Sequence, residues 1–259
     1  MIARGLLILA VCGSIPTGAA AAEESFTPHK AVYRIVAADE GGGVTRADGW
    51  VVANIEASCG GWSTQNAITF RVVMPDGKVV DSSIKTSAWE SRDGLRYRFS
   101  AQNVRGEKLS GDANIPASGD VGKVVFSQPP GYEMVLPAGA MFPMTFNRRI
   151  LAAARNGEES VSAIIFDAGH SSLLVDTTVT IGGGDLSSDE TGRGLPAIKG
   201  LSWPLRYTFS TRTADLSGNT KFHARLFDNG IYGDMLFDFG DFTFEAILEQ
   251  VVPGTEPDC

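Results

Sequence analysis

Ser82 and Lys85 are the residues whose spacing most directly suggests chemistry, because they match the Ser-x-x-Lys motif of penicillin-binding enzymes. In those enzymes the serine is the nucleophile, and Ser-Asp-Asn and Lys-Thr-Gly motifs complete the site. Neither partner motif occurs in this sequence, and residues 79–89 follow the pattern of a β-strand rather than a helix start. The sequence favours a chance match, with a hydrolase kept as an alternative hypothesis.

A second cluster places acid, imidazole and hydroxyl groups close together in the chain, at Asp167, His170, Ser171 and Ser172. A Ser-His-Asp triad needs these groups to converge in space beside an oxyanion hole. The strained Gly-x-Ser-x-Gly turn of α/β-hydrolases is absent, and the run from Asp167 to His170 is typical of a turn between two strands. We therefore predict no catalytic residues and no enzymatic activity.

Metal and cofactor ligands are also sparse. The three histidines, His29, His170 and His223, lack metal-ligand spacing to one another. Four acids near the C-terminus could suggest calcium, but no loop has the ligand spacing of an EF-hand. These acids are Asp228, Asp234, Asp238 and Asp241. The glycines at 182–184 lack the companion residues of a phosphate loop or a dinucleotide fingerprint. We predict no metal and no cofactor.

The first 22 residues have the layout of a secretory signal. Arg4 provides a basic start, residues 5–12 form an apolar core, and a run of alanines ends at Ala22. This core is shorter than the roughly 20 apolar residues that span a bilayer. We predict cleavage after Ala22. Cys12 allows a lipoprotein signal as an alternative, although Val11 is a poor match to the small residue that precedes a lipidated cysteine.

Cleavage would leave two cysteines, Cys59 and Cys259, which lie 200 positions apart. In an oxidising compartment such an even pair favours a disulfide, and two unpaired thiols are the alternative. A bond between them would close a very long loop, which the chain-entropy model values at about 5 kcal/mol.

Removal of 22 of the 259 residues leaves 237, and we predict that residues 23–259 form a single domain. The net charge of −8 argues against nucleic acid as a partner and against electrostatic docking to anionic lipid. No second long apolar segment follows the signal, so we do not expect the exported chain to span a membrane.

Alternating apolar and polar residues, broken by Gly, Asp and Asn, predict an antiparallel β protein. The predicted strands of the first half are residues 31–36, 50–56, 62–74, 79–89, 95–102, 108–115, 123–127 and 132–136. Those of the second half are residues 161–166, 173–181, 205–213, 220–227, 231–237 and 242–251. Residues 182–200 are rich in Gly, Ser and acids, which predicts a surface loop.

The sequence of residues 143–156 predicts a helix. Pro143 suits the first turn, and the Asn-Gly pair at 156–157 ends it. Phe146 and Ile150 fall on one face, which a β protein must bury against its sheet. The many aromatic residues after position 140 fit either a filled core or a core that stays partly open as an apolar ligand groove.

Several short motifs occur in an order that resembles a known family. They are His29-Lys30-Ala31-Val32-Tyr33, Gly61-Trp62 after Cys59, Leu136-Pro137-Ala138-Gly139-Ala140-Met141-Phe142-Pro143 before the helix, Trp203-Pro204, Phe227-Asp228-Asn229-Gly230, Leu236-Phe237-Asp238-Phe239-Gly240-Asp241-Phe242 and the terminal Cys259. Each motif is weakly specific alone. Together they resemble the EipB family of bacterial cell-envelope integrity proteins over nearly the whole exported chain.

The resemblance implies a periplasmic location and a single, highly curved, many-stranded antiparallel β-spiral with one packed helix, a fold similar to periplasmic carriers of lipids and lipoproteins. It also implies a disulfide between Cys59 and Cys259, which we expect to fix the C-terminal tail beside an early strand and to hold the sheet in its wrapped form. No enzymatic activity is established for the family, whose role is envelope integrity.

From the resemblance we expect a non-enzymatic periplasmic protein that binds a lipid, another amphiphile or an envelope-derived ligand. A candidate apolar groove would be lined by Phe142, Phe146 and Ile150, together with facing strand residues. The alternative is a protein-interaction module that supports peptidoglycan or lipoprotein assembly through a periplasmic protein partner.

Overall fold

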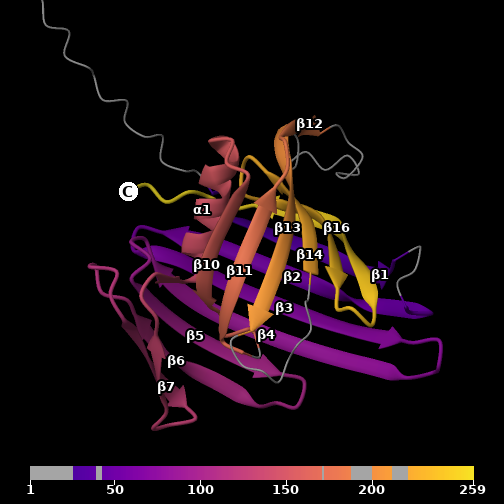
Figure 1. Cartoon of the computed structure of the whole chain (residues 1–259), viewed down its shortest axis with the longest axis horizontal. Helices are drawn as coiled ribbons and strands as arrows, with labels where there is room; N and C mark the ends of the chain where they lie inside the picture. Colours follow the sequence, from indigo (N-terminus) through magenta and orange to yellow (C-terminus); the bar gives the residue numbers. More distant parts are fainter. Residues whose placement is uncertain (1–25, 39–42, 171, 188–199, 212–220) are drawn as a thin grey trace, which may run out of the picture.

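A computed structural model describes residues 26–38, 43–170, 172–187, 200–211 and 221–259 (Figure 1). Within these residues the chain forms one sheet of sixteen strands and a single helix, α1 (Pro143–Arg155). The predicted mainly β fold, with one curved sheet and one packed helix, is confirmed. The predicted signal at residues 1–22 and its cysteine lie outside the described residues.

Each predicted strand overlaps an observed one. The first group is β1 (His29–Ala37), β2 (Arg46–Ser58), β3 (Gly61–Val73), β4 (Val79–Ser91), β5 (Arg96–Asn103), β6 (Lys108–Asn114), β7 (Gly122–Gln128), β8 (Glu133–Leu136) and β9 (Ala140–Met141). The second group is β10 (Ser160–Phe166), β11 (Leu174–Ile181), β12 (Asp185–Ser187), β13 (Gly200–Thr211), β14 (Lys221–Phe227), β15 (Tyr232–Asp238) and β16 (Thr243–Pro253).

The chain enters the sheet at its middle. The spatial order runs from β8 in sequence order back to β1, then to β16, and on through β15, β14, β13, β11 and β10 to β9. Neighbours pair antiparallel except β9 and β10, which are parallel. The two edge strands are therefore β8 and β9, which follow one another in the sequence and are not paired with each other.

The strand order has two arms, β1–β8 on one side of the β1–β16 pair and β9–β16 on the other. These two arms face one another across a shared core. Figure 1 shows α1, β10, β11 and β13 crossing over the long strands β2–β5. Trp62 of β3, Ile150 of α1 and Trp203 of β13 belong to one cluster of buried side chains. Side chains alternate between this interior and the outer face along each strand, which is why the strands were readable from the sequence.

The helix is the element that fills the space between the arms. Pro143 stands in its first turn, and Gly157 beyond its end has a φ of +73°. Its inner face buries six side chains: Met144, Phe146, Ile150, Leu151, Ala153 and Ala154. The described part of the chain contains no helix with the length and apolar character needed to cross a membrane.

Two short strands were not predicted. The prediction of a loop at residues 182–200 is wrong for Asp185–Ser187, which form β12 and pair with the start of β13. Residues 188–199 lie outside the described part of the chain. The second short strand is β9, whose two residues pair with β10. Strands of two or three residues show no readable alternation, so their pairing depends on the fold around them.

A disulfide joins Cys59, in the turn between β2 and β3, to Cys259, with Cα atoms 5.7 Å apart. The C-terminal tail therefore does lie beside an early strand. That this bond helps to hold the sheet in its wrapped form stays a prediction, and β16 also pairs with β1 along its length. The free edges of the sheet are β8 and β9, and the disulfide fastens the tail near the middle of the strand order.

Candidate functional site

A pocket of about 250 Å³ lies inside the wrapped sheet, between α1 and strands β3, β10, β11 and β13. Its apolar wall includes Phe146 from the helix, Ile165 from β10, Val175 from β11 and Phe209 from β13. These side chains point inward because they occupy alternate positions of strands whose other faces are exposed. The arrangement offers a partly open apolar surface with aromatic side chains from α1 and β13.

Polar groups stand at the wall of the same pocket. They are Asn66, Asn147, Asp167, His170, Thr177 and Tyr207. The Tyr207 hydroxyl lies 2.7 Å from that of Tyr232, which in turn donates to Oδ1 of Asn147 at 3.3 Å. This chain of hydrogen bonds ties the helix to β13 and β15 at the pocket.

Three titratable side chains of the pocket have shifted pKa values, and burial raises that of Tyr207. Burial raises the pKa of Asp167, although the backbone N–H of Gly169 donates to its carboxylate at 2.8 Å. Burial lowers the pKa of His170, opposed by the nearby Asp167 carboxylate. The shifts of Asp167 and His170 both favour the uncharged form of the side chain.

The predicted groove residues are in different surroundings. Phe146 lines the pocket. Phe142 is completely buried in a neighbouring cluster, where its ring stacks on Tyr97 at 4.9 Å between centroids. Ile150 is completely buried in the core beside α1. Neither Phe142 nor Ile150 lines the pocket, so the helix contributes mainly through Phe146 and Asn147.

Most of the pocket was not predicted from the sequence. Asn66 lies on the inward-facing side of β3, between Thr64 and Ile68, yet it is exposed to the pocket. A polar residue at an inward position of a strand was the available signal for an unfilled interior. Phe209 and Val175 gave no such signal, because buried aromatic and β-branched residues are ordinary in a core.

The strand conformation of β4 separates the two residues of the Ser-x-x-Lys match. Residues three apart on a strand project to opposite faces. Ser82 therefore faces the interior, whereas Lys85 lies on the exposed outer face, in register with Ala67 and Gln102. The ammonium group of Lys85 is not positioned to activate the Ser82 hydroxyl.

The acid, imidazole and hydroxyl cluster forms the turn between β10 and β11, as the sequence predicts. Nδ1 of His170 accepts a hydrogen bond from the backbone N–H of Ser172 at 3.1 Å. In a Ser-His-Asp triad that nitrogen carries the proton donated to the acid, so it cannot accept here and serve the triad at once. Ser171 lies outside the described residues.

The C-terminal acids are dispersed rather than gathered around a cation. Asp228 pairs with Arg155 at 2.6 Å, Asp234 accepts from the backbone N–H of Leu248, and Asp238 accepts from that of Gly240. Across the described residues no group of three metal-ligating side chains comes together. His29 is buried at the start of β1 and contacts the carbonyl of Thr27 through Nδ1 at 2.8 Å.

Comparison with known proteins gives concordant matches. A protein-family model described as EipB-like matches residues 20–253. A Brucella abortus protein named "Cell envelope integrity protein EipB" is 25% identical over 257 residues, covering 96% of this chain and 92% of that protein. A crystal structure of a β-barrel-like protein with a domain of unknown function, also from Brucella abortus, superposes with a TM-score of 0.77 at 24% identity. It covers 90% of this chain and 100% of the other, and it shows the fold.

Proposed function

The chain belongs to the EipB-like family, and we propose that it is a non-enzymatic periplasmic protein that supports envelope integrity by binding the apolar part of an amphiphile beside α1. The printed name of the Brucella abortus relative, a cell envelope integrity protein, supports the envelope role. The observation that carries the binding proposal is the interior pocket of about 250 Å³, walled by Phe146, Val175 and Phe209.

The chemistry of the pocket suits one end of an amphiphile. Apolar walls favour an alkyl or ring group through burial of its surface, at roughly 25 cal/mol per Å². Asn66, Asn147 and His170 offer hydrogen bonds without a fixed charge at the same wall. Ordinary ligand pockets measure about 300–1,000 Å³, so a pocket of about 250 Å³ suits one narrow apolar group rather than a whole lipid.

The proposed periplasmic location is supported by features outside the pocket. The signal layout of residues 1–22 supports export, and the Cys59–Cys259 disulfide is of the kind that persists in an oxidising compartment. We propose that residues 23–259 are the exported chain and that they act as one domain, because β1 and β16 of the two arms are paired directly.

Extraction of the protein purified from periplasm, followed by mass spectrometry, tests the proposal. We expect a co-purified amphiphile, and displacement of a fluorescent fatty-acid probe by the extracted compound. An empty protein that also fails to bind the probe would refute binding at this pocket. A control sample is unfolded and refolded without lipid, and its binding of the probe is measured. Probe binding by this sample would show that a protein purified without ligand has lost the ligand and still has affinity for it.

A second candidate function is a protein-interaction module for envelope assembly machinery. The observation that favours it is a group of exposed apolar side chains at the β8 edge of the sheet. These are Val121, Val125, Tyr132 and Val135, of which Val135 is 65% exposed. An unpaired edge strand can accept a strand from a partner. A photo-crosslinking residue at position 135 should capture one dominant protein in cells, whereas the same residue at Val252, also exposed, should not.

A further inference from the structure

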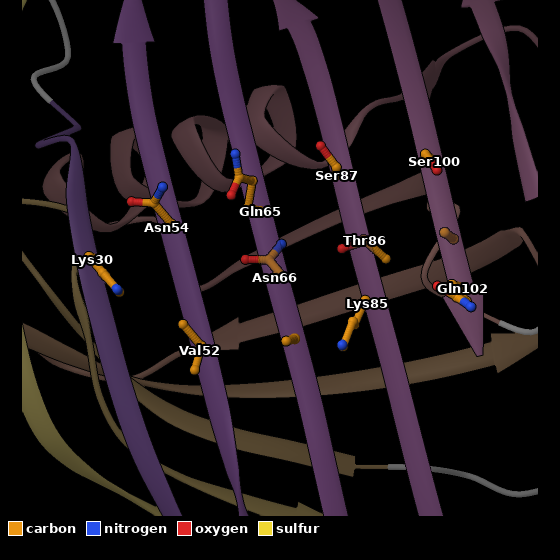
Figure 2. Close-up of a pocket in the computed structure, with 12 residues that line it drawn as sticks. Lys30, Val52, Asn54, Gln65, Asn66, Lys85, Thr86, Ser87, Ser100 and Gln102 are labelled. Carbon is orange, nitrogen blue, oxygen red and sulfur yellow. The ribbon is translucent and has the colours of Figure 1, made fainter. Parts of the chain in front are cut away.

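The outer face of the long strands β1–β5, opposite the interior pocket, is hollowed in two adjoining places. One hollow, of about 490 Å³, crosses all five strands (Figure 2). The other, of about 1,010 Å³, lies farther along β1–β4 and reaches Trp50 and Arg71. The site described above lies on the inner face of the sheet, and Asn66 is the one residue that lines both that site and the first hollow.

Short side chains in the middle of the face produce the first hollow. Val52 of β2 and Ala67 of β3 are directly opposite one another in the register and form the floor. Longer side chains surround them, with Lys30 on β1 and Lys85 on β4 at opposite sides. Figure 2 shows the side chains of Lys30 and Lys85 on either side of the strands that carry Val52 and Asn66.

A row of hydrogen-bonding side chains runs across the strands beside that floor. Successive register partners in the row are Lys30, Asn54, Gln65, Ser87 and Ser100. Neighbouring strands are about 4.8 Å apart, so the five residues span roughly 19 Å. Asn54 also donates to Glu56 at 2.9 Å, which leaves its amide oxygen available. The row presents amide and hydroxyl groups at regular intervals, without an apolar anchor of the kind that protein interfaces use.

The charges of this face are unevenly paired. Arg71 forms an ion pair with Asp81 at 2.7 Å, and Arg34 pairs with Glu249 at 2.9 Å. Lys30 and Lys85 take part in no ion pair within the described residues. Two unpaired ammonium groups on opposite sides of one hollow, in a chain of net charge −8, form a local site for an anion.

Trp50 adds an aromatic surface at the boundary of the two hollows. It lies on the same face as Val52, two residues away on β2, and between Arg34 and Thr69 in the register. Its side chain is 49% exposed. A large exposed aromatic ring flanked by polar side chains offers a flat apolar face with hydrogen-bonding groups at its rim.

We propose that this outer face binds a glycan strand that carries carboxylates. The axial C–H bonds of a sugar ring pack on the face of an indole, its hydroxyl groups pair with amide and hydroxyl side chains, and its carboxylates pair with ammonium groups. The Trp50 ring supplies the first of these contacts, and the row through Asn54 and Gln65 supplies the second. The unpaired ammonium groups of Lys30 on β1 and Lys85 on β4 supply the third. An acidic peptide would use the lysines but not the aromatic surface.

Titration calorimetry of the purified protein with a hexamer of galacturonic acid tests the proposal. We expect binding that weakens with added salt, and much weaker binding of cellohexaose, which has the same length and no charge. Poly-glutamate of matched charge should also bind at least about tenfold more weakly than the uronate hexamer, a difference of about 1.4 kcal/mol. No binding of the uronate, or equal binding of poly-glutamate, would overturn the glycan assignment.

Paired variants locate the site. Lys30→Gln and Lys85→Gln should each weaken uronate binding about tenfold, because each removes one charge-assisted contact. The matched control is Lys221→Gln, which changes an exposed lysine on β14 and should leave binding unchanged. Trp50→Ala should also weaken binding, whereas Tyr132→Ala, at the same 49% exposure on another part of the surface, should not.

These variants also separate the outer face from the interior pocket. The lysine variants should retain binding of the fluorescent fatty-acid probe, since neither side chain lines the inner pocket. Unchanged uronate affinity in both lysine variants, with unchanged circular dichroism, would overturn the placement of the site on this face.

Discussion

The side chain of Glu90, on β4, caps the helix at Thr145, 55 residues later in the chain. Its Oε1 accepts hydrogen bonds from the backbone N–H of Thr145 at 2.7 Å and from its hydroxyl at 2.5 Å. The other oxygen accepts from the backbone N–H of Met144 at 2.9 Å. The helix has no side-chain cap of its own at Phe142, so a carboxylate from the facing sheet replaces it.

Removal of this cap should loosen α1. Glu90→Ala leaves the backbone N–H groups of Met144, which is buried, and Thr145, which is half-buried, without this partner, at a cost of about 1–3 kcal/mol for the buried group. Glu90→Gln keeps one acceptor and should cost less. Urea unfolding followed by circular dichroism measures both. Glu90→Ala with wild-type stability would show that the helix does not depend on this contact.

The ionisation of Glu90 predicts the pH dependence of the same contact. Burial raises its pKa from the ordinary value of 4.5, and the hydrogen bonds from Thr145 and Met144 oppose the rise only in part. The folded state therefore holds the proton more tightly than the unfolded state. The contribution of Glu90 to stability is greatest below pH 4.5 and declines as pH rises through the raised folded pKa. The difference in stability between wild type and Glu90→Gln should follow that decline.

Gly94, in the turn between β4 and β5, leaves room for the same helix start. Its φ is +69°, and a Cβ there would lie 2.3 Å from Oγ1 of Thr145. Gly94→Ala should destabilise the protein by more than the roughly 1–2 kcal/mol expected from a left-handed backbone alone. Gly77→Ala is the matched control, with a φ of +84° and open space around the added carbon. Equal melting temperatures for the two variants would contradict the proposed clash.

The burial of four tyrosines predicts that the free energy of unfolding falls steeply at alkaline pH. Burial raises the pKa of Tyr232 to about 12, and burial also raises the pKa values of Tyr33, Tyr97 and Tyr207. Unfolded tyrosines ionise near pH 10, so the folded state holds more protons above that pH and stability falls as pH rises. Each such tyrosine contributes a slope of up to about 1.4 kcal/mol per pH unit.

An absorbance titration of the phenolate band checks this expectation. Four of the five tyrosines should ionise only with unfolding. Tyr207→Phe should reduce the amplitude of that late transition by one tyrosine. Gradual ionisation of all tyrosines in the folded protein would contradict the burial described here.

The strands were predictable because each shows its own periodicity. Alternation over residues 79–89 predicted β4, which runs from Val79 to Ser91, and the helix ends were marked by proline and glycine. The sheet order was not predictable, because pairing of β1 with β16 joins segments more than 200 residues apart. No local sequence pattern predicts that β1, the first strand, lies in the middle of the sheet.

The candidate pocket was predictable only from the helix side. The apolar face of α1 identified Phe146, whereas Asn66 and Phe209 reach the pocket through the wrapping of the sheet. The capping role of Glu90 was also not predictable. A glutamate within an alternating strand has the pattern of an ordinary polar position, and its contact with the helix depends on how the helix packs against the sheet.

Cleavage of the disulfide should lower stability without unfolding the sheet. Cys259→Ser releases a loop of 200 residues, for which the entropic model gives about 5 kcal/mol. For a chain of this size that corresponds to a decrease in melting temperature of about 10–20 °C. The β1–β16 pairing remains, so the circular dichroism spectrum should stay native. An unchanged melting temperature would show that the bond has no stabilising role.

Filling the interior pocket should abolish amphiphile binding while preserving the fold. Val175→Phe directs a ring from β11 into a space of about 250 Å³, so the ring takes part of the volume that we assign to the ligand and narrows the rest. Overpacking should cost about 1–3 kcal/mol, and the affinity for a fluorescent fatty-acid probe should fall at least about tenfold. Val125→Phe, the same change at a half-exposed position on β7, is the control and should bind the probe normally. If Val175→Phe is folded and keeps wild-type affinity, the probe does not use the part of the pocket beside Val175.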